Sequence, residues 1–231
     1  MTDKRFFYLE FAQEFDAKMN RYDLSTRLKL IFYEELSVEL KDKLVLDAGS
    51  GTGWFSREAE KLGGRIISLD MGIELLKKVK QKCQSDAVAG DVLDLPFKKD
   101  IFDVLISTEV IEHTVDPKRA VMEMCRVLKP GGKLILTTPN IIWIFAVWLA
   151  NLLKLRPYKG YENWVSRAAL KKWLDANGLK VEIIRGFHLF PFVSPVFYPL
   201  LGFFDRWGKI LGPLMLNIGI KAEKQGGGNS A

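Results

Sequence analysis

Residues 44–53 read L-V-L-D-A-G-S-G-T-G, and this stretch decides the fold. It starts with three apolar residues, as a short, fully buried strand does. Glycine then occupies alternate positions, at Gly49, Gly51 and Gly53. Because glycine has no Cβ and adopts positive φ, such a loop can turn sharply and let a ligand lie against its backbone. Apolar residues at helical spacing follow over 54–62, so the stretch predicts the opening of a nucleotide-binding βαβ unit.

The glycine spacing indicates which nucleotide the loop would bind. The dinucleotide fingerprint G-x-G-x-x-G needs a glycine at position 54, where this chain has Trp54. The pattern is instead D-x-G-x-G-x-G from Asp47. It resembles the first motif of the class I S-adenosylmethionine (SAM) methyltransferases. SAM has no pyrophosphate, so the loop needs no phosphate cradle and must only let the methionine end and the sulfonium pass close to the backbone.

An acidic residue follows the second predicted strand, residues 65–69. Asp70 stands at its C-terminal end, close to the spacing expected of an acid that binds ribose hydroxyls. A carboxylate accepts two hydrogen bonds at once, which suits a cis-diol. We therefore expect Asp70 to bind ribose and Met71 to lie beside the adenine. The alternative is that Asp70 caps the helix predicted over 72–82.

Further strands are predicted over residues 87–89, 101–107 and 132–138, with a last, antiparallel strand over 214–221. Strands that alternate with helices predict an α/β fold with a parallel, doubly wound sheet. Ligands bind outside the carboxyl ends of such strands. Four polar side chains at or just beyond strand ends should therefore converge on one site, namely Asp47, Asp70, Asp91 and Ser107.

Residues 44–138 resemble the class I methyltransferases as a set of motifs in order: D-A-G-S-G-T-G, the acid at 70, G-D-V-L-D-L-P-F, F-D-V-L-I-S-T-E-V-I-E-H and L-K-P-G-G-K-L. The resemblance implies a Rossmann-like, seven-stranded, mostly parallel sheet with the last strand antiparallel and helices on both faces. It implies SAM as the cofactor, with an acid in the place of Asp91 taking the adenine amino group beside the backbone of Val92. The expected cofactor-binding residues are Asp47, Gly49, Ser50, Gly51, Gly53, Asp70, Met71, Asp91, Val92 and Ser107.

The next stretch, residues 139–160, is apolar with a basic end and resembles the insertion of the ubiquinone-pathway O-methyltransferases, which helps those enzymes sit on membranes. Aromatic residues followed by Lys154, Arg156 and Lys159 suit an interface with anionic lipid. The alternative is a buried lid helix. Neither this stretch nor residues 187–204 is expected to span a bilayer, because the first is too short and prolines recur every fourth residue in the second.

His113 is the expected catalytic base, with Glu109 as a second catalytic candidate. SAM carries its own driving force, so the protein has mainly to align the acceptor and remove its proton. Glu109, Glu112 and His113 would share one face of a helical turn and could hold a divalent cation such as Mg²⁺. The resemblance implies such a metal role, and the alternative is that the two glutamates only cap and solvate the turn.

Length and composition predict one domain in several parts. Apolar residues at helical spacing predict helices over 5–18 and 21–40. These helices either pack against the sheet or form a helical lid over 1–42, with Tyr8, Phe15 or Tyr22 touching the ligand. We further expect a SAM-binding core over 43–140, an insertion over 141–165, the C-terminal part over 166–224 and a disordered tail over 225–231. Two cysteines and no signal peptide fit a reducing cytosol. The expected function is methyl transfer to a hydroxyl oxygen of a small hydrophobic or lipid-linked acceptor in the cytoplasm or at the inner face of the membrane. N- or C-methylation is the alternative. Nucleic acid is not an expected partner, although a basic stretch over 151–190 keeps RNA methylation open, and the oligomeric state is unknown.

Overall fold

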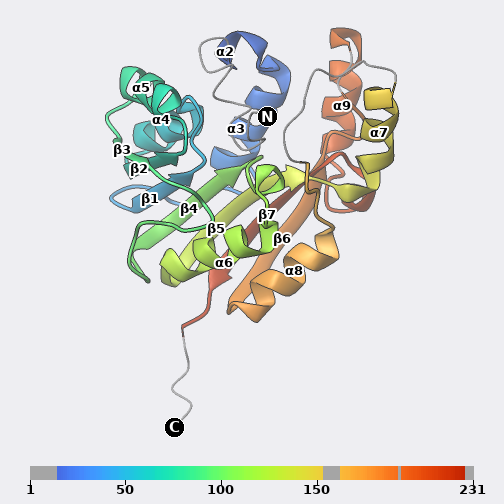
Figure 1. Ribbon diagram of the computed structural model, residues 1–231. Helices are drawn as coiled ribbons and strands as arrows, with labels where there is room; N and C mark the ends of the chain where they lie inside the picture. The colour runs from blue at the N-terminus through green and yellow to red at the C-terminus, as the bar shows by residue number, and fades with distance from the viewer. Residues whose placement is uncertain (1–14, 153–161, 192–193, 227–231) are drawn as a thin grey trace.

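The fold is an α/β sandwich built on one seven-stranded sheet (Figure 1). The computed structural model describes residues 15–152, 162–191 and 194–226. The strand order is β3-β2-β1-β4-β5-β7-β6, and β7 runs antiparallel to both of its neighbours while the other pairs are parallel. This confirms the predicted fold class. The strands are β1 (Leu44–Ala48), β2 (Arg65–Asp70), β3 (Asp86–Ala89), β4 (Phe102–Thr108), β5 (Leu128–Pro139), β6 (Leu179–Phe187) and β7 (Asn217–Lys224).

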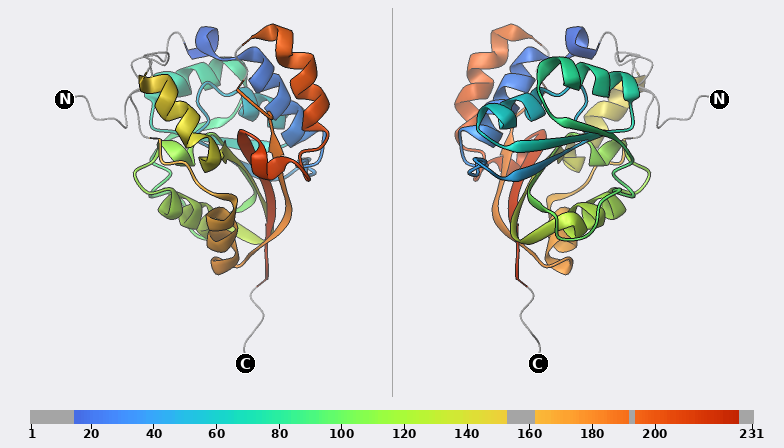
Figure 2. Two further views of the ribbon diagram at one scale, coloured as in Figure 1. Left: turned by 90° about the vertical axis from the view of Figure 1, so that its right-hand side faces the viewer. Right: turned by 90° about the vertical axis from the view of Figure 1, so that its left-hand side faces the viewer.

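Helices cover both faces of the sheet (Figure 2). The described α-helices are α2 (Phe15–Lys18), α3 (Arg21–Phe32), α4 (Trp54–Lys61), α5 (Ile73–Lys82), α6 (Pro117–Val127), α7 (Ile144–Leu152), α8 (Arg167–Ala176) and α9 (Tyr198–Asp205). Short 3₁₀ turns are η2 (Ile111–His113), η3 (Ile141–Trp143), η4 (Pro195–Phe197) and η5 (Gly212–Leu214). Of the labelled helices, only α6 and α8 lie toward the end of the molecule that carries the C-terminus, and the others lie toward the opposite end (Figure 1).

The central strands separate two hydrophobic cores. Successive side chains of a strand point to opposite faces, so Val45 packs with α3 and α4, whereas Leu46 packs with α6 and α8. Leu105 of β4 lies on the same side as Leu46, and its neighbour Ile106 lies on the other. Because both faces of the central strands are covered, successive residues on either face are buried, which is why residues 44–46 read as a continuous apolar run.

Element boundaries differ from the sequence predictions at several places. The strand predicted over 132–138 begins earlier, because β5 spans Leu128–Pro139. The helix predicted over 21–40 ends at Phe32, although Leu36 and Leu40 remain buried in the core that α3 forms. The last strand begins at Asn217 instead of 214, because η5, with Pro213 near its start, occupies residues 212–214. Most of the helix predicted over 5–18 and the tail after 226 lie outside the described residues.

The proline-rich stretch over 187–204 does contain a helix, α9, which the sequence argument did not predict. Pro199 lies in the first turn of this helix. Backbone N–H groups in the first turn have no acceptor within the helix, so a proline there loses no hydrogen bond. Within the described residues, no helix combines the length and apolar character needed to cross a membrane.

Candidate functional site

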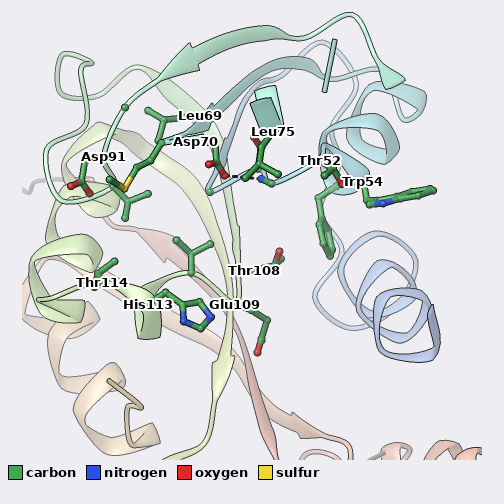
Figure 3. A pocket seen from close by; sticks show the side chains of 18 of the residues that line it. Thr52, Trp54, Leu69, Asp70, Leu75, Asp91, Thr108, Glu109, His113 and Thr114 are labelled. Atoms are coloured by element: carbon green, nitrogen blue, oxygen red, sulfur yellow. Dashed lines mark hydrogen bonds between the residues drawn. The ribbon is translucent and has the colours of Figure 1, made fainter. Parts of the chain in front are cut away.

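A cavity of about 310 Å³ lies beyond the carboxyl ends of β1, β2 and β4 (Figure 3). We call its two sides the Asp70 end and the Glu109 end. The Asp70 end comprises Gly49, Ser50, Gly51, Asp70, Met71, Asp91 and Val92, and the Glu109 end comprises Arg27, Thr108, Glu109, His113 and Thr114. In open α/β sheets, ligands bind beyond the carboxyl ends of the strands, and this cavity lies there. Most of the predicted cofactor residues line it.

The glycine loop needs its glycines. Gly49, Gly51 and Gly53 have φ values of 80°, 53° and 86°, a region that L-residues with a side chain rarely occupy. A Cβ on Gly49 would lie 2.4 Å from a methyl carbon of Val110, so the close approach of these two segments also excludes a side chain. The N–H groups of Gly49 and Ser50 donate to the carbonyl of Leu69, which fixes the loop against the end of β2.

Both carboxylate oxygens of Asp70 accept backbone hydrogen bonds, one from the glycine loop and one from the residue before α5. Its Oδ2 accepts a hydrogen bond of 2.9 Å from Gly51 N, and its Oδ1 accepts one of 2.8 Å from Gly72 N. Burial raises the pKa of Asp70, and the hydrogen bonds from Gly72 and Gly51 oppose that rise. An ionised carboxylate offers about four lone-pair sites, so two remain for a ligand's hydroxyl groups. Asp70 therefore lines the cavity and also binds the backbone of Gly72. Because Gly72 is itself the N-cap residue of α5, Asp70 is not the helix cap that the alternative predicted.

Met71, Asp91 and Val92 complete the Asp70 end. All three line the cavity, as the sequence predicts, and Asp91 lies across from Asp70 in Figure 3. Asp91 Oδ1 accepts a hydrogen bond of 2.9 Å from Leu93 N, which shapes the turn that carries it. An apolar wall beside two carboxylates suits a flat, partly polar base together with a ribose.

Asp47 and Ser107 lie behind the cavity wall instead of lining it. Asp47 is 2% exposed, and its Oδ2 accepts a hydrogen bond of 2.5 Å from Ser56 Oγ on α4. Burial raises the pKa of Asp47 to about 7, and the bond from Ser56 opposes this. Asp47 thus connects β1 to α4 and supports the loop from below. Ser107 is buried near the end of β4. Gly53, also predicted to bind the cofactor, does not line the cavity; it is the N-cap residue of α4, and its backbone packs next to Val79.

Glu109 has an unusual backbone and a buried carboxyl group. Its φ is 53°, which is strained for a residue with a side chain and is often associated with function. Its Oε2 accepts a hydrogen bond of 2.9 Å from Asn217 Nδ2, and its Oε1 makes no hydrogen bond within the described part of the chain. Burial, followed by repulsion from Glu112, raises the pKa of Glu109 to about 8. A carboxyl group with such a pKa acts as a base in its ionised form, which predominates above about pH 8.

Sequence reasoning missed Arg27, the arginine of the Glu109 end. Arg27 of α3 lines the cavity and forms an ion pair with Asp23, one helical turn earlier. Asp23 is 8% exposed, and its Oδ1 lies 3.2 Å from Nε2 of the buried His188. His188 N in turn donates to Asp205 Oδ1 at 2.6 Å. The i,i+4 spacing of Asp23 and Arg27 is a weak signal in the sequence, but nothing in it connects this pair to His188.

The predicted metal site does not form. Only residues 111–113 make a helical turn, whereas Glu109 lies outside it with left-handed backbone, so the three side chains do not share a face. Glu112 Oε2 accepts a hydrogen bond of 3.0 Å from Thr138 Oγ1, and its Oε1 lies 3.8 Å from His113 Nε2. Among the described residues, no three His, Cys, Asp or Glu side chains are placed to hold a metal ion.

The predicted lid is described in part. Met19 and Leu24 line the cavity, so the N-terminal region does cover one side of it. Tyr22 does not line it; its ring stacks on Tyr198 of α9 with centroids 4.1 Å apart. Tyr8 and the side chain of Phe15 lie outside what the structure describes, so their contact with a ligand stays a prediction.

The residues present fit SAM. Ser50 Oγ is a buried polar atom beside the cavity, and it has no hydrogen-bond partner within the described residues. Asp70 can receive ribose hydroxyls, the apolar wall at Met71 and Val92 can receive adenine, and Arg27 can pair with the methionine carboxylate.

Known proteins resemble this chain in sequence. A family profile described as a methyltransferase domain matches residues 46–136. A ubiquinone biosynthesis O-methyltransferase from Coxiella burnetii is 28% identical over 187 residues, covering 76% of this chain and 79% of that protein. The protein of that name from Xanthomonas euvesicatoria pv. vesicatoria is 30% identical over 167 residues, covering 67% of this chain and 70% of its own length.

The fold has solved counterparts. The structure of a complex between the Haloferax volcanii Trm112 methyltransferase activator and a methyltransferase matches with a TM-score of 0.70 at 18% identity, covering 95% of this chain and 98% of that one. At this identity the match concerns the fold alone. Taken with the glycine loop, Asp70 and the sequence relatives, it leads to one assignment: the chain belongs to the class I SAM-dependent methyltransferases.

Proposed function

We propose that this methyltransferase acts on a hydroxyl oxygen of a small hydrophobic or lipid-linked acceptor. The observation that carries the proposal is Glu109, a buried carboxyl group at the cavity whose pKa is raised to about 8. Methylation of a hydroxyl oxygen releases a proton, so a base at the cavity wall is what this reaction needs. The sequence relatives named as O-methyltransferases support the same choice.

The chain's own residues would divide the work between the two ends of the cavity. When bound, SAM supplies an electrophilic methyl group on a sulfonium centre. Asp70 and the glycine loop hold the cofactor, while Glu109 Oε1 accepts the proton of the acceptor hydroxyl. Asn217 fixes the carboxyl group through Oε2 and leaves Oε1 to the acceptor. His113 also lines the cavity and is placed to orient the hydroxyl or to receive the proton in turn.

Exposed apolar side chains support an acceptor that is lipid-linked. Phe145 and Trp148 of α7 are 67% and 57% exposed, and their rings lie 5.7 Å apart. Phe203 of α9 and Trp207 just after it are also about half exposed. The helices α7 and α9 lie at the same end of the molecule (Figure 1). Large exposed apolar areas mark contact sites for partners or membranes. We propose that this end contacts anionic membrane, from which the acceptor enters.

The acceptor proposal is tested by product identification. The purified chain is incubated with methyl-labelled SAM and a set of catechols and hydroquinones, with and without an isoprenoid tail. We expect a labelled O-methyl ether, formed faster from the tailed compounds. Label on nitrogen or carbon of a metabolite, or in RNA from a parallel incubation, would contradict the O-methyl proposal while leaving the methyltransferase assignment intact.

The membrane proposal has a separate test. The chain should co-sediment with vesicles that contain phosphatidylglycerol, and the variant Phe145→Ser/Trp148→Ser should remain largely in the supernatant. This double variant should still methylate a water-soluble acceptor at the wild-type rate, because neither side chain lines the cavity. Recovery of the wild-type chain only in the supernatant would contradict the membrane contact.

A further inference from the structure

The short helix α2 is connected to the glycine loop through the side chain of Asp16. We infer that Asp16 is a positioning residue for the cofactor: it holds the N-terminal segment, the glycine loop and α5 together, and so fixes the wall of the cavity at Thr52 and Trp54. The inference rests on the SAM-binding site described above. Asp16 itself does not line the cavity, so it would act through its neighbours.

Asp16 receives three hydrogen bonds from residues far away in the sequence. Its Oδ1 accepts from Thr52 Oγ1 at 2.5 Å and from Trp54 Nε1 at 3.0 Å. Its Oδ2 accepts from Lys82 Nζ, at the end of α5, at 2.6 Å. Both oxygens are therefore used, and a neutral amide in this place could accept at only one atom.

Lys82 completes the cluster. Its Nζ also donates to the carbonyl of Thr52 at 3.0 Å and lies 4.7 Å from the ring centroid of Trp54, which is cation–π distance. Burial raises the pKa of Asp16, but the bonds from Lys82, Thr52 and Trp54 outweigh that effect and lower it below its usual value. The Asp16 carboxylate is thus charged at neutral pH, opposite a fixed cation.

The cluster reaches the cavity directly. Thr52 and Trp54 line it on one side, as Figure 3 shows, and Met19 reaches it from the segment just after α2. Trp54 occupies the position at which dinucleotide-binding loops have their third glycine. Here the indole N–H donates a hydrogen bond to Asp16, and the indole ring makes a cation–π contact with Lys82. Loss of the Asp16 carboxylate would detach α2 from the loop and loosen this wall.

The test compares Asp16→Asn with the wild-type full-length chain by calorimetric titration with S-adenosylhomocysteine. A hydrogen-bonded charge pair of this kind is worth about a tenfold change in affinity, so we expect Kd and the KM for SAM to rise about tenfold. The kcat at saturating SAM should stay within about twofold, because no group that touches the acceptor has changed. A catalytic role would lower kcat instead.

Lys82→Met provides a second, independent variant, and Asp16→Asn/Lys82→Met tests the coupling. Because both residues act in one cluster, the double variant should bind little more weakly than whichever single variant has the lower affinity. Lys77→Met is the matched control, since Lys77 pairs with Glu74 on the exposed face of the same helix and should bind like wild type. Wild-type affinity in both Asp16→Asn and Lys82→Met would overturn the inference, whereas no binding by the wild-type chain would overturn the cofactor assignment itself.

Discussion

The Asp70 end of the cavity is assembled from residues 49–92, whereas the Glu109 end draws on residues 27, 109 and 113 with support from 188 and 217. The first is built from consecutive strand ends, and its main bonds join backbone N–H groups to one carboxylate. The second is built from buried charged side chains that meet across the fold. One end of the cavity is therefore local and backbone-defined, whereas the other end depends on long-range packing of side chains.

The energetic consequences differ as well. A carboxylate that accepts backbone N–H bonds is stabilised by groups that mutation of its neighbours cannot remove. At the Glu109 end, each buried charge depends on another side chain, as Arg27 depends on Asp23 and Asp23 on His188. Removing one partner leaves an uncompensated buried charge, which costs more than the pair itself contributes. The Glu109 end should therefore be the more sensitive of the two to single substitutions.

The largest effect is expected for Asp23→Asn. It removes the partner of the buried Arg27, and we expect the free energy of unfolding to fall by about 3–5 kcal/mol in urea denaturation. Burial raises the pKa of Asp23, but Arg27 and His188 lower it below the usual value overall. A lowered folded-state pKa stabilises the protein above the ordinary pKa of an aspartate, and this contribution is lost as pH falls through the folded value.

The free energy of unfolding should accordingly fall less on acidification in Asp23→Asn than in wild type. Asp86→Asn serves as the control, because Asp86 is exposed on the edge strand β3 and should change stability by less than about 0.5 kcal/mol. Equal stability of the two variants would show that the Glu109 end is not held by this ion pair.

The next effect is expected for Glu109→Gln, with a fall in kcat of about 10²–10³-fold. A general base must be deprotonated, so the wild-type kcat/KM should rise with pH up to the pKa of about 8 and then level off. Glutamine cannot titrate, so the rise of kcat/KM with pH should disappear in the variant, while S-adenosylhomocysteine binds as before. Glu74→Gln, on the exposed face of α5, should keep both the rate and the profile. An unchanged pH profile in Glu109→Gln would assign the base to another residue.

A smaller effect is expected for Asp70→Ala, which should weaken S-adenosylhomocysteine binding by about 10–100-fold, as the loss of charge-assisted hydrogen bonds does. Asp70→Asn should lie between this variant and wild type, because its amide oxygen can still accept from Gly51. Asp94→Ala, in the exposed loop after Asp91, is the control for calorimetry. Wild-type affinity in Asp70→Ala would mean that the Asp70 end holds the cofactor by backbone and apolar contacts alone.

The fold and the Asp70 end could be predicted because each of their signals lies within a short stretch of sequence. Positive φ at three alternate positions demands glycine, a buried parallel strand demands an apolar run, and the residue after such a strand must face the ligand edge. Prediction failed where tertiary contact decided the outcome. Glu109, Glu112 and His113 were expected on one helical face, but the hydrogen bond from Asn217 and the left-handed backbone at 109 separate them.

By itself, the sequence determined the parallel sheet, the loop of glycines and the acid beside it, because backbone conformation and strand burial restrict which residues can stand there. Only the tertiary structure decided that Arg27 reaches the cavity, that His188 supports its partner and that Asp16 joins α2 to the loop. The physical reason is distance along the chain. A buried charge must find its partner in space, and residues 23 and 188, or 16 and 82, carry no local pattern that shows they will meet.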